Sequence, residues 1–287
     1  KSHKLQRLHD HTLYLPYATS LRMSDLGYST TVQSSLDICF NHLGTYIKSL
    51  DQAIHTSYPA YEKIGVKING QYRQLNNTIL QIENEYYSDV RPKRVARPEE
   101  RPLHALRESG VQYIEARNID VNPFLPVGID NQQALFIDTF LISCLLMSDE
   151  IICPAECKMA NDNLQKVITR GREPGLSLVT PTGKPTLVEA GGRLLDQIQI
   201  VGELLDEVHE TKTYNLSVKT QRLKLEDASL TPSAQILSAL KESGLDYAEW
   251  VLLKSKEHKE TFTHASSSTA ALKDLARKAS RSLIEQQ

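Results

Sequence analysis

Segment 111–124, VQYIEARNIDVNPF, places an acidic and a basic side chain two residues apart. In a β-strand the side chains alternate between two faces, so Tyr113, Glu115 and Arg117 would share one face. The residues between them are apolar and would form the opposite face. Glu115 could hold a divalent cation, and Arg117 could clamp a phosphate or a carboxylate. The segment therefore predicts phosphate chemistry carried out on a sheet.

A second segment, residues 15–28, gathers polar side chains ahead of a helical stretch. Arg22 could pair with a substrate carboxylate through two hydrogen bonds, and Tyr28 could donate a hydrogen bond. A surface ion pair between Arg22 and Asp25 in a turn is the plainer explanation. The residue types alone favour that plainer explanation.

Two more charged segments precede the strand. Residues 78–87 alternate, so we expect another strand, with Glu83 and Glu85 on its polar face. Two carboxylates at this spacing repel each other unless a cation lies between them, which leaves metal binding and solvent exposure equally open. The basic segment 91–94 could contact polyphosphate, although a run of charge is more often a solvated loop. Its proline restricts the segment to a loop or a sheet edge.

The elements that must position these residues differ along the chain. Residues 1–127 are expected to form a strand-containing part, with a hairpin turn at Asn69-Gly70 and helices over 32–54 and 104–109. Helical periodicity dominates residues 128–287. There we expect helices over 131–148, 158–170, 187–210, 231–243, 245–257 and 268–286. The pattern predicts an α+β protein whose strand-containing part is followed by a mainly helical region.

Composition narrows the possible partners. The net charge of −2 leaves no basic surplus, so nucleic acid is not an expected partner. The longest apolar run, 134–147, is too short to span a membrane and predicts a buried helix. Four cysteines in 287 residues predict no disulfide framework and fit a reducing cytoplasm. Cys39 and Cys144 lie in apolar runs and are expected to be core thiols.

Several stretches together resemble the gamma-proteobacterial type of glutamate–cysteine ligase. They are LPYATSLRMSDLGY, LQIENEYY, RPKR, YIEARNIDVNPF and GREPGL, and they follow the family's order and spacing from about residue 14 to 178. The resemblance implies ATP-dependent joining of the γ-carboxyl of L-glutamate to the amine of L-cysteine, through γ-glutamyl phosphate and with Mg²⁺. That reaction opens glutathione biosynthesis. The resemblance also implies a fold similar to glutamine synthetase, whose curved antiparallel sheet forms a funnel-shaped site.

Residue roles follow from the resemblance position by position. Glu115 matches a magnesium ligand of the family, and Arg117 matches the arginine that contacts the transferred phosphoryl group. Arg22, Tyr28 and Tyr87 match residues that line the amino-acid pocket on the cysteine side. The acidic pair and the 91–94 segment lie in matching motifs without a definite role.

The sequence departs from the family pattern in one respect. Most magnesium-binding carboxylates of the family, and part of both amino-acid pockets, lie upstream of the region matched here. The chain starts at Lys1 without an initiator methionine, so we expect the C-terminal portion of such a ligase, inactive without the missing N-terminal half. Two alternatives stay open: a related carboxylate–amine ligase with another amine acceptor, or a non-catalytic remnant that binds a partner protein.

Overall fold

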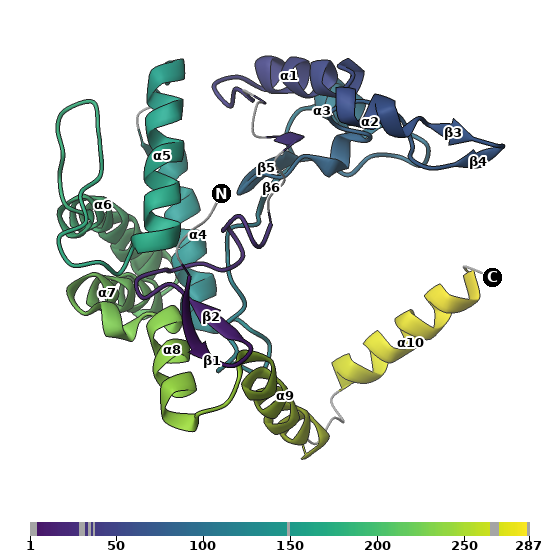
Figure 1. Cartoon of the computed structure of the whole chain (residues 1–287). Coiled ribbons are helices and arrows are strands. Elements are labelled where there is room, and N and C mark those ends of the chain that lie inside the picture. Colours follow the sequence, from purple (N-terminus) through teal and green to yellow (C-terminus); the bar gives the residue numbers. More distant parts are fainter. Residues whose placement is uncertain are drawn as a thin grey trace.

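The computed structural model describes residues 5–28, 32–33, 36, 38–147, 150–264 and 270–285. In this part, helices combine with antiparallel sheets, which confirms the predicted α+β class (Figure 1). Each described sheet has two strands: β1 (Gln6–His9) with β2 (Thr12–Tyr14), β3 (Lys67–Ile68) with β4 (Gln71–Tyr72), and β5 (Val90–Lys93) with β6 (Tyr113–Ala116).

Helices precede, separate and follow these strands. Those of the first part are α1 (Leu43–His55), α2 (Pro59–Ile64), the 3-10 turn η2 (Glu83–Glu85) and α3 (Pro102–Ser109). Those of the second part are α4 (Asn131–Leu146), α5 (Pro154–Arg170), α6 (Leu187–Val208), α7 (Thr213–Glu226), the 3-10 turn η3 (Ala228–Leu230), α8 (Pro232–Ser243), α9 (Tyr247–His264) and α10 (Ala270–Glu285). Within the described residues, no helix is long and apolar enough to cross a membrane.

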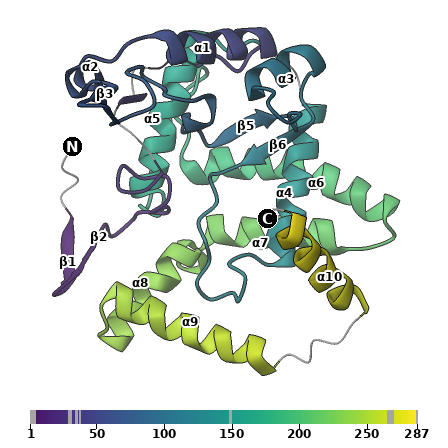
Figure 2. The ribbon, with the colours of Figure 1, turned by 90° about the vertical axis from the view of Figure 1, so that its right-hand side faces the viewer.

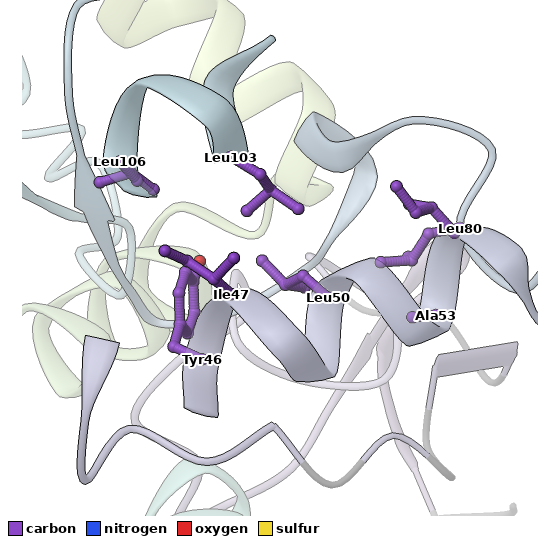
Figure 3. Packing of buried hydrophobic residues seen from close by; sticks show 8 residues of the cluster. Tyr46, Ile47, Leu50, Ala53, Leu80, Leu103 and Leu106 are labelled. Carbon is purple, nitrogen blue, oxygen red and sulfur yellow. The ribbon is translucent and has the colours of Figure 1, made fainter. Parts of the chain in front are cut away.

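A small apolar core holds the layer above the β5–β6 pair. α1 presents one apolar stripe, and its Leu50 is only 2 % exposed. Leu103 and Leu106 of α3 and the fully buried Leu80 pack against this stripe (Figure 3). Pro102 suits the first turn of α3, where its missing N–H is not needed. The views in Figures 1 and 2 both place β5 and β6 beneath α1 and α3.

The second core lies among α4, α6 and α7, which pack against one another (Figure 2). Ile198 of α6 and Val218 of α7 are almost completely buried there. Phe136 and Phe140 of α4 stack with their ring centres 6.4 Å apart and cover this cluster. α4, α6 and α7 thus form a packed unit with its own apolar interior.

The N-terminal hairpin packs on the C-terminal helices. Thr12 Oγ donates to Asp246 Oδ1 at 2.7 Å and accepts from the backbone N–H of Tyr247 at 2.8 Å. His9 Nε2 lies 3.1 Å from the carbonyl oxygen of Leu240 at the end of α8. Segments more than 230 residues apart therefore meet at the junction of α8 and α9. The expected division after residue 127 stays a prediction.

Several predicted elements agree with the structure. The hairpin turn at Asn69-Gly70 is confirmed, with positive φ at both residues, as such a turn requires. The helices expected after residue 128 are present, and most lie within four residues of their predicted bounds; α9 runs to His264, seven residues past the predicted end at 257. Thr231 caps α8 by accepting from the N–H of Ala234, with Pro232 at the first helical position.

Two expected elements of the first part are wrong. Residues 78–87 do not form a strand but turn into η2. The helix expected over 32–54 begins only at Leu43; residues 34, 35 and 37 of that range lie outside the described residues. Just ahead of this start, the side chain of Asn41 exchanges two hydrogen bonds with the backbone of Ile152, which precedes α5.

The helical region contains one element that sequence periodicity missed. α7 has apolar residues two apart, at Leu216 and Val218 and again at Leu223 and Leu225, which is the spacing of a strand. Packing against α4 and α6 overrides this local pattern. The expectation of core thiols is also wrong, because Cys144 is exposed and Cys39 only half-buried.

The α1–α3 core yields a stability prediction. Leu50→Ala should lower the free energy of unfolding by about 2–5 kcal/mol, because it removes buried methyl groups and leaves a cavity. Urea unfolding followed by circular dichroism measures the change. Leu75→Ala is the matched control, since Leu75 is 68 % exposed and should change stability little. Equal effects of the two substitutions would contradict the assignment of this core.

Candidate active site

The predicted strand carries the charged pair as expected, in a shorter form. β6 spans Tyr113–Ala116 and pairs antiparallel with β5. The N–H of Arg117 donates to the carbonyl of Asp89 at 2.7 Å, which extends the pairing by one residue. In this register Arg91 lies opposite Glu115, so both side chains share one face. The basic segment is therefore a strand at a sheet edge, the second of the two positions that its proline allows.

Glu115 is surrounded by positive charge. Its Oε2 lies 3.0 Å from Arg117 Nε and 3.8 Å from Lys93 Nζ. The Arg117 guanidinium, with Lys93 and Arg91 nearby, holds the pKa of Glu115 below its ordinary value. In turn, the Glu115 carboxylate raises the pKa of Arg117. Both groups are therefore charged at neutral pH.

Three buried polar atoms of this cluster have no hydrogen-bond partner among the described residues: Arg91 Nε, Glu115 Oε2 and Arg117 Nε. Arg117 Nε and Glu115 Oε2 are close enough for an ion pair, but the N–H is not aligned with the oxygen. Buried polar groups in folded proteins are nearly always satisfied. Such orphaned atoms on one face of a sheet are typical of a site that binds a charged ligand.

Segment 15–28 brings the other predicted residues to the same place. Tyr28 Oη accepts hydrogen bonds from Arg117 Nη1 at 2.5 Å and Arg91 Nη2 at 3.1 Å. Arg22 Nε donates to the carbonyl of Arg117, and its guanidinium lies 5.0 Å from the centre of the Tyr28 ring. The Tyr87 ring lies 4.5 Å from that of Tyr28, centre to centre. All five residues predicted for the site are therefore close together.

Asp120 fixes the start of this segment. Its Oδ1 accepts from the backbone N–H groups of Leu21 at 3.1 Å and Arg22 at 2.8 Å, and its Oδ2 accepts from the hydroxyl of Ser20. The turn then needs glycine at position 27, because a Cβ there would lie 2.3 Å from the carbonyl oxygen of Arg22. Asp120 thus couples the position of Arg22 to the strand that carries Glu115 and Arg117.

Gln33 fixes the backbone at Tyr87, as Asp120 does at Arg22. Its side-chain amide donates to the carbonyl of Glu85 at 2.8 Å and accepts from the N–H of Tyr87 at 2.8 Å. These two hydrogen bonds to the backbone fix the chain after η2, where the Tyr87 ring contacts the Tyr28 ring. The position of Tyr87 therefore depends on a glutamine far away in sequence.

The acidic pair is not part of the site. Glu83 accepts from the N–H of Leu103 and pairs with Arg101, with Nε and Oε1 3.2 Å apart. Glu85 accepts from the N–H of Gln81 at 2.6 Å. Glu83 is thus held at the start of α3, and Glu85 is held by the backbone ahead of η2. Glu83 is buried in these contacts, so neither metal binding nor solvent exposure describes it. In the described part of the chain, no group of three or more His, Cys, Asp or Glu side chains could hold a metal ion.

Sequence reasoning assigns no definite role to Arg91 and Asp120, two residues that contact the predicted site residues. Arg91 lies in a run of charge interrupted by proline, so the sequence does not distinguish its role from that of Arg94. Its position opposite Glu115 in the strand register makes the distinction. Arg94 turns away and donates to the carbonyl of Ser109. Asp120 lies in the motif of the predicted strand, but its partners are about 100 residues upstream. An aspartate just after a strand is the only sequence signal for that contact.

The anchor at Asp120 can be tested by amide hydrogen exchange. Asp120→Ala should speed exchange at Leu21 and Arg22, because their N–H groups lose their acceptor, and should cost about 1–3 kcal/mol of stability. Asp130→Ala is the control, since Asp130 also accepts a backbone N–H but caps α4. The control should lose stability without faster exchange at residues 21 and 22. Unchanged exchange in Asp120→Ala would exclude the anchoring role.

The charge cluster predicts a specific pH dependence. A carboxylate whose folded pKa is depressed stabilises the fold above its unfolded pKa, and that contribution is lost as pH falls through the folded pKa. Glu115→Gln should therefore be less stable than the parent at pH 7. The gap should shrink as pH falls below 4.5, the ordinary value for this group. Urea unfolding from pH 7 to pH 3 measures it.

Glu173→Gln provides the control for this measurement. Arg170 lowers the pKa of Glu173 as well, but Arg170 is a half-exposed single partner near the end of α5, whereas the two cations beside Glu115 are largely covered. Exposed pairs contribute little to stability, so the control should show almost no gap at any pH. A gap for Glu115→Gln that stays constant down to pH 3 would contradict the pairing described above.

Known proteins match this chain along most of its length. A family model described as glutamate-cysteine ligase matches residues 1–167. A glutamate–cysteine ligase of Pseudomonas aeruginosa (strain LESB58) is 47% identical over 99% of this chain and 54% of its own length. One from Pseudomonas fluorescens is 44% identical over 100% of this chain and 54% of its own length. The chain thus spans about half the length of the curated relatives it matches.

Solved structures agree with these sequence matches. The crystal structure of a glutamate–cysteine ligase from Francisella tularensis in complex with AMP matches with a TM-score of 0.85 and 36% identity, over 94% of this chain and 53% of that chain. A bifunctional glutathione synthetase from Pasteurella multocida matches with a TM-score of 0.59 at 21% identity, over 85% of this chain and 27% of that chain, which bears on the fold alone. Because the family model covers more than half of the residues, the chain belongs to the glutamate–cysteine ligase family.

Proposed function

We propose that the complete protein containing this chain joins the γ-carboxyl group of L-glutamate to the amine of L-cysteine at the expense of ATP. The product is γ-glutamylcysteine, and the reaction is the first step of glutathione biosynthesis. The observation that carries the proposal is the convergence of Arg91, Arg117 and Lys93 on Glu115, in which Arg91 Nε has no hydrogen-bond partner among the described residues. Family membership and a relative in complex with AMP support it.

The reaction requires activation of a poor electrophile. Transfer of the γ-phosphoryl group of ATP to the glutamate γ-carboxylate gives γ-glutamyl phosphate and ADP. The cysteine amine then attacks the acyl carbon and displaces inorganic phosphate. Negative charge spreads over the phosphoryl oxygens in the transfer, so positioned positive charge is the main catalytic requirement. We assign this role to Arg117, whose planar fork of donors suits phosphoryl oxygens.

Glu115 fits a role as one ligand of Mg²⁺. Magnesium prefers oxygen ligands and neutralises phosphate charge when it is bound. Glu115 Oε2 has no aligned hydrogen bond, and the cations that face it, Arg117 and Lys93, would give way to a metal ion in this role. The described residues supply no further carboxylate cluster. The remaining ligands would come from nucleotide phosphates, water and residues outside this chain.

Arg22, Tyr28 and Tyr87 would line the cysteine side of the amino-acid pocket. They present one guanidinium and two phenols around a shared centre beside Arg117. Such groups supply donors for a substrate carboxylate and an aromatic wall for a short side chain. The cysteine amine would then lie close to the phosphoryl group that Arg117 contacts.

The relatives' length bears on how this chain works. We propose that these 287 residues act as the C-terminal portion of the ligase and are inactive without the N-terminal half. The missing half would complete both amino-acid pockets and the magnesium site. A reducing compartment such as the cytoplasm suits the four free cysteines.

A product assay tests the proposal. The complete gene product should form γ-glutamylcysteine and ADP from glutamate, cysteine and MgATP, followed by mass spectrometry. The 287-residue chain alone should form none. Cysteine should give a much higher kcat/KM than alanine or 2-aminobutyrate; the opposite preference would support a ligase with another amine acceptor. An inactive complete product would overturn the proposed function and support the non-catalytic remnant.

Arg117→Lys in the complete protein tests the phosphoryl contact. The loss of a forked donor in the transition state should lower kcat about 100-fold. Arg170→Lys is the control, because Arg170 pairs with Glu173 on the surface of α5 and should leave kcat unchanged. Steady-state kinetics with ADP detection measures both. Equal rates for Arg117→Lys and the parent would remove Arg117 from the mechanism.

A further inference from the structure

Arg91 is a buried cation. It is only 3 % exposed and bonds to the Tyr28 hydroxyl and to the turn η2. Nη1 donates to the carbonyl of Asn84 at 3.1 Å and Nη2 donates to Tyr28 Oη at 3.1 Å. Among the residues that the structure describes, no carboxylate forms an ion pair with it, and Nε has no partner. Burial of a charge with so few partners is unfavourable, so the fold retains Arg91 for another reason.

The Tyr28 hydroxyl explains what that reason is. A phenolic oxygen can accept two hydrogen bonds and donate one. Arg91 Nη2 and Arg117 Nη1 both donate to it, at 3.1 Å and 2.5 Å. Neither guanidinium can accept a hydrogen bond, since arginine carries donors only. With both acceptor positions filled, the hydroxyl has only its hydrogen left to offer.

We propose that Arg91 is a positioning residue that makes Tyr28 an obligate hydrogen-bond donor to the amino-acid substrate. The inference rests on the proposed function and deepens it. Arg91 does not touch the substrate; it fixes the rotation of the Tyr28 O–H and directs the hydrogen away from both guanidinium groups. The ligand atom that Tyr28 meets must therefore be an acceptor, such as a carboxylate oxygen or a thiolate sulfur. An amine in the ammonium form would be rejected at this position.

The contact with Asn84 gives the device its rigidity. Because Nη1 is hydrogen-bonded to the backbone of η2, the guanidinium plane is held by a contact that does not involve Tyr28. Arg91 also lies on β5, directly opposite Glu115 in the strand register. One side chain thus relates the donor on segment 15–28 to the strand that carries the phosphoryl-contacting Arg117. A merely structural Arg91 would stabilise the fold but would not change recognition of one substrate.

A double-mutant cycle in the complete protein tests the proposal. Arg91→Met and Tyr28→Phe should each raise the KM for cysteine about tenfold, as expected for loss of one hydrogen bond to a charged group. The KM for glutamate should stay within about twofold. The double variant should be no worse than Tyr28→Phe alone, because Arg91 acts through the hydroxyl. Additive effects, or equal changes in both KM values, would overturn the proposal.

Arg91→Lys keeps the test valid if Arg91→Met does not fold. An ammonium group retains the charge but cannot reach the Asn84 carbonyl and the Tyr28 hydroxyl in the same forked geometry. It should show a smaller rise in the KM for cysteine, and that rise should vanish in the Tyr28→Phe background. A rise that persists without the hydroxyl would contradict the role in positioning Tyr28.

Hydrogen exchange of residues 20–28 supplies a readout without turnover. Arg91→Lys should speed exchange there, whereas the control Arg94→Lys should not, because Arg94 donates to Ser109 on the other side of β5. An inactive parent with faster exchange in Arg91→Lys would refute the proposed function and leave the positioning intact. An active parent with unchanged exchange and unchanged KM for cysteine in Arg91→Lys would refute the positioning alone.

Discussion

The site depends on the pairing of β5 with β6. This short antiparallel pair sets Arg91 opposite Glu115 and Lys93 opposite Tyr113, and so decides which charges meet. A shift of the register by one residue would place Glu115 and Arg117 on the face of the sheet opposite to Arg91 and Lys93. Two strands alone are marginally stable, and backbone hydrogen bonds at both ends extend this pair, from Arg117 N–H to the Asp89 carbonyl and from Gln112 N–H to the Lys93 carbonyl. Arg91 also bonds to the backbone of η2, which contacts α1 and α3, so the helical layer bears on the strand pair through η2.

Segment 15–28 depends on the same pair. It forms no helix or strand, and contacts from the region of β5 and β6 hold it together with the end of α5, where the Ile168 carbonyl accepts from the Thr19 N–H at 2.9 Å. Asp120 fixes its backbone, the carbonyl of Arg117 fixes Arg22, and two guanidinium groups fix Tyr28. Irregular segments often carry binding residues on a rigid scaffold. Here the strand pair is hydrogen-bonded to the side chains of segment 15–28. Under the proposed function, the residues that bind the amino acid and the arginine that contacts the phosphoryl group therefore cannot move independently.

The sequence predicted which charged and aromatic residues lie together better than it predicted the elements around them. Alternation placed Glu115 and Arg117 on one face because a strand leaves no other arrangement. The same alternation wrongly predicted a strand at 78–87. There Glu83 accepts a hydrogen bond from the Leu103 N–H and pairs with Arg101, and these tertiary contacts outweigh the local strand propensity. Asp120 and Arg91 acquire their roles only through partners distant in sequence. Long-range hydrogen bonds of this kind leave no periodic signal in one chain.

The charge balance of the cluster makes the case for a bound anion. Arg91, Lys93 and Arg117 surround a single carboxylate, Glu115, and their mutual repulsion is not neutralised by any other ion pair in the described residues. A polyphosphate would supply negative charge to the arginines, and a divalent cation would replace Lys93 and Arg117 at Glu115. Under the proposed function, both partners would arrive together as the nucleotide with its metal. The three cations would then face phosphoryl oxygens, and binding energy realised in the transition state would lower the barrier of the proposed phosphoryl transfer.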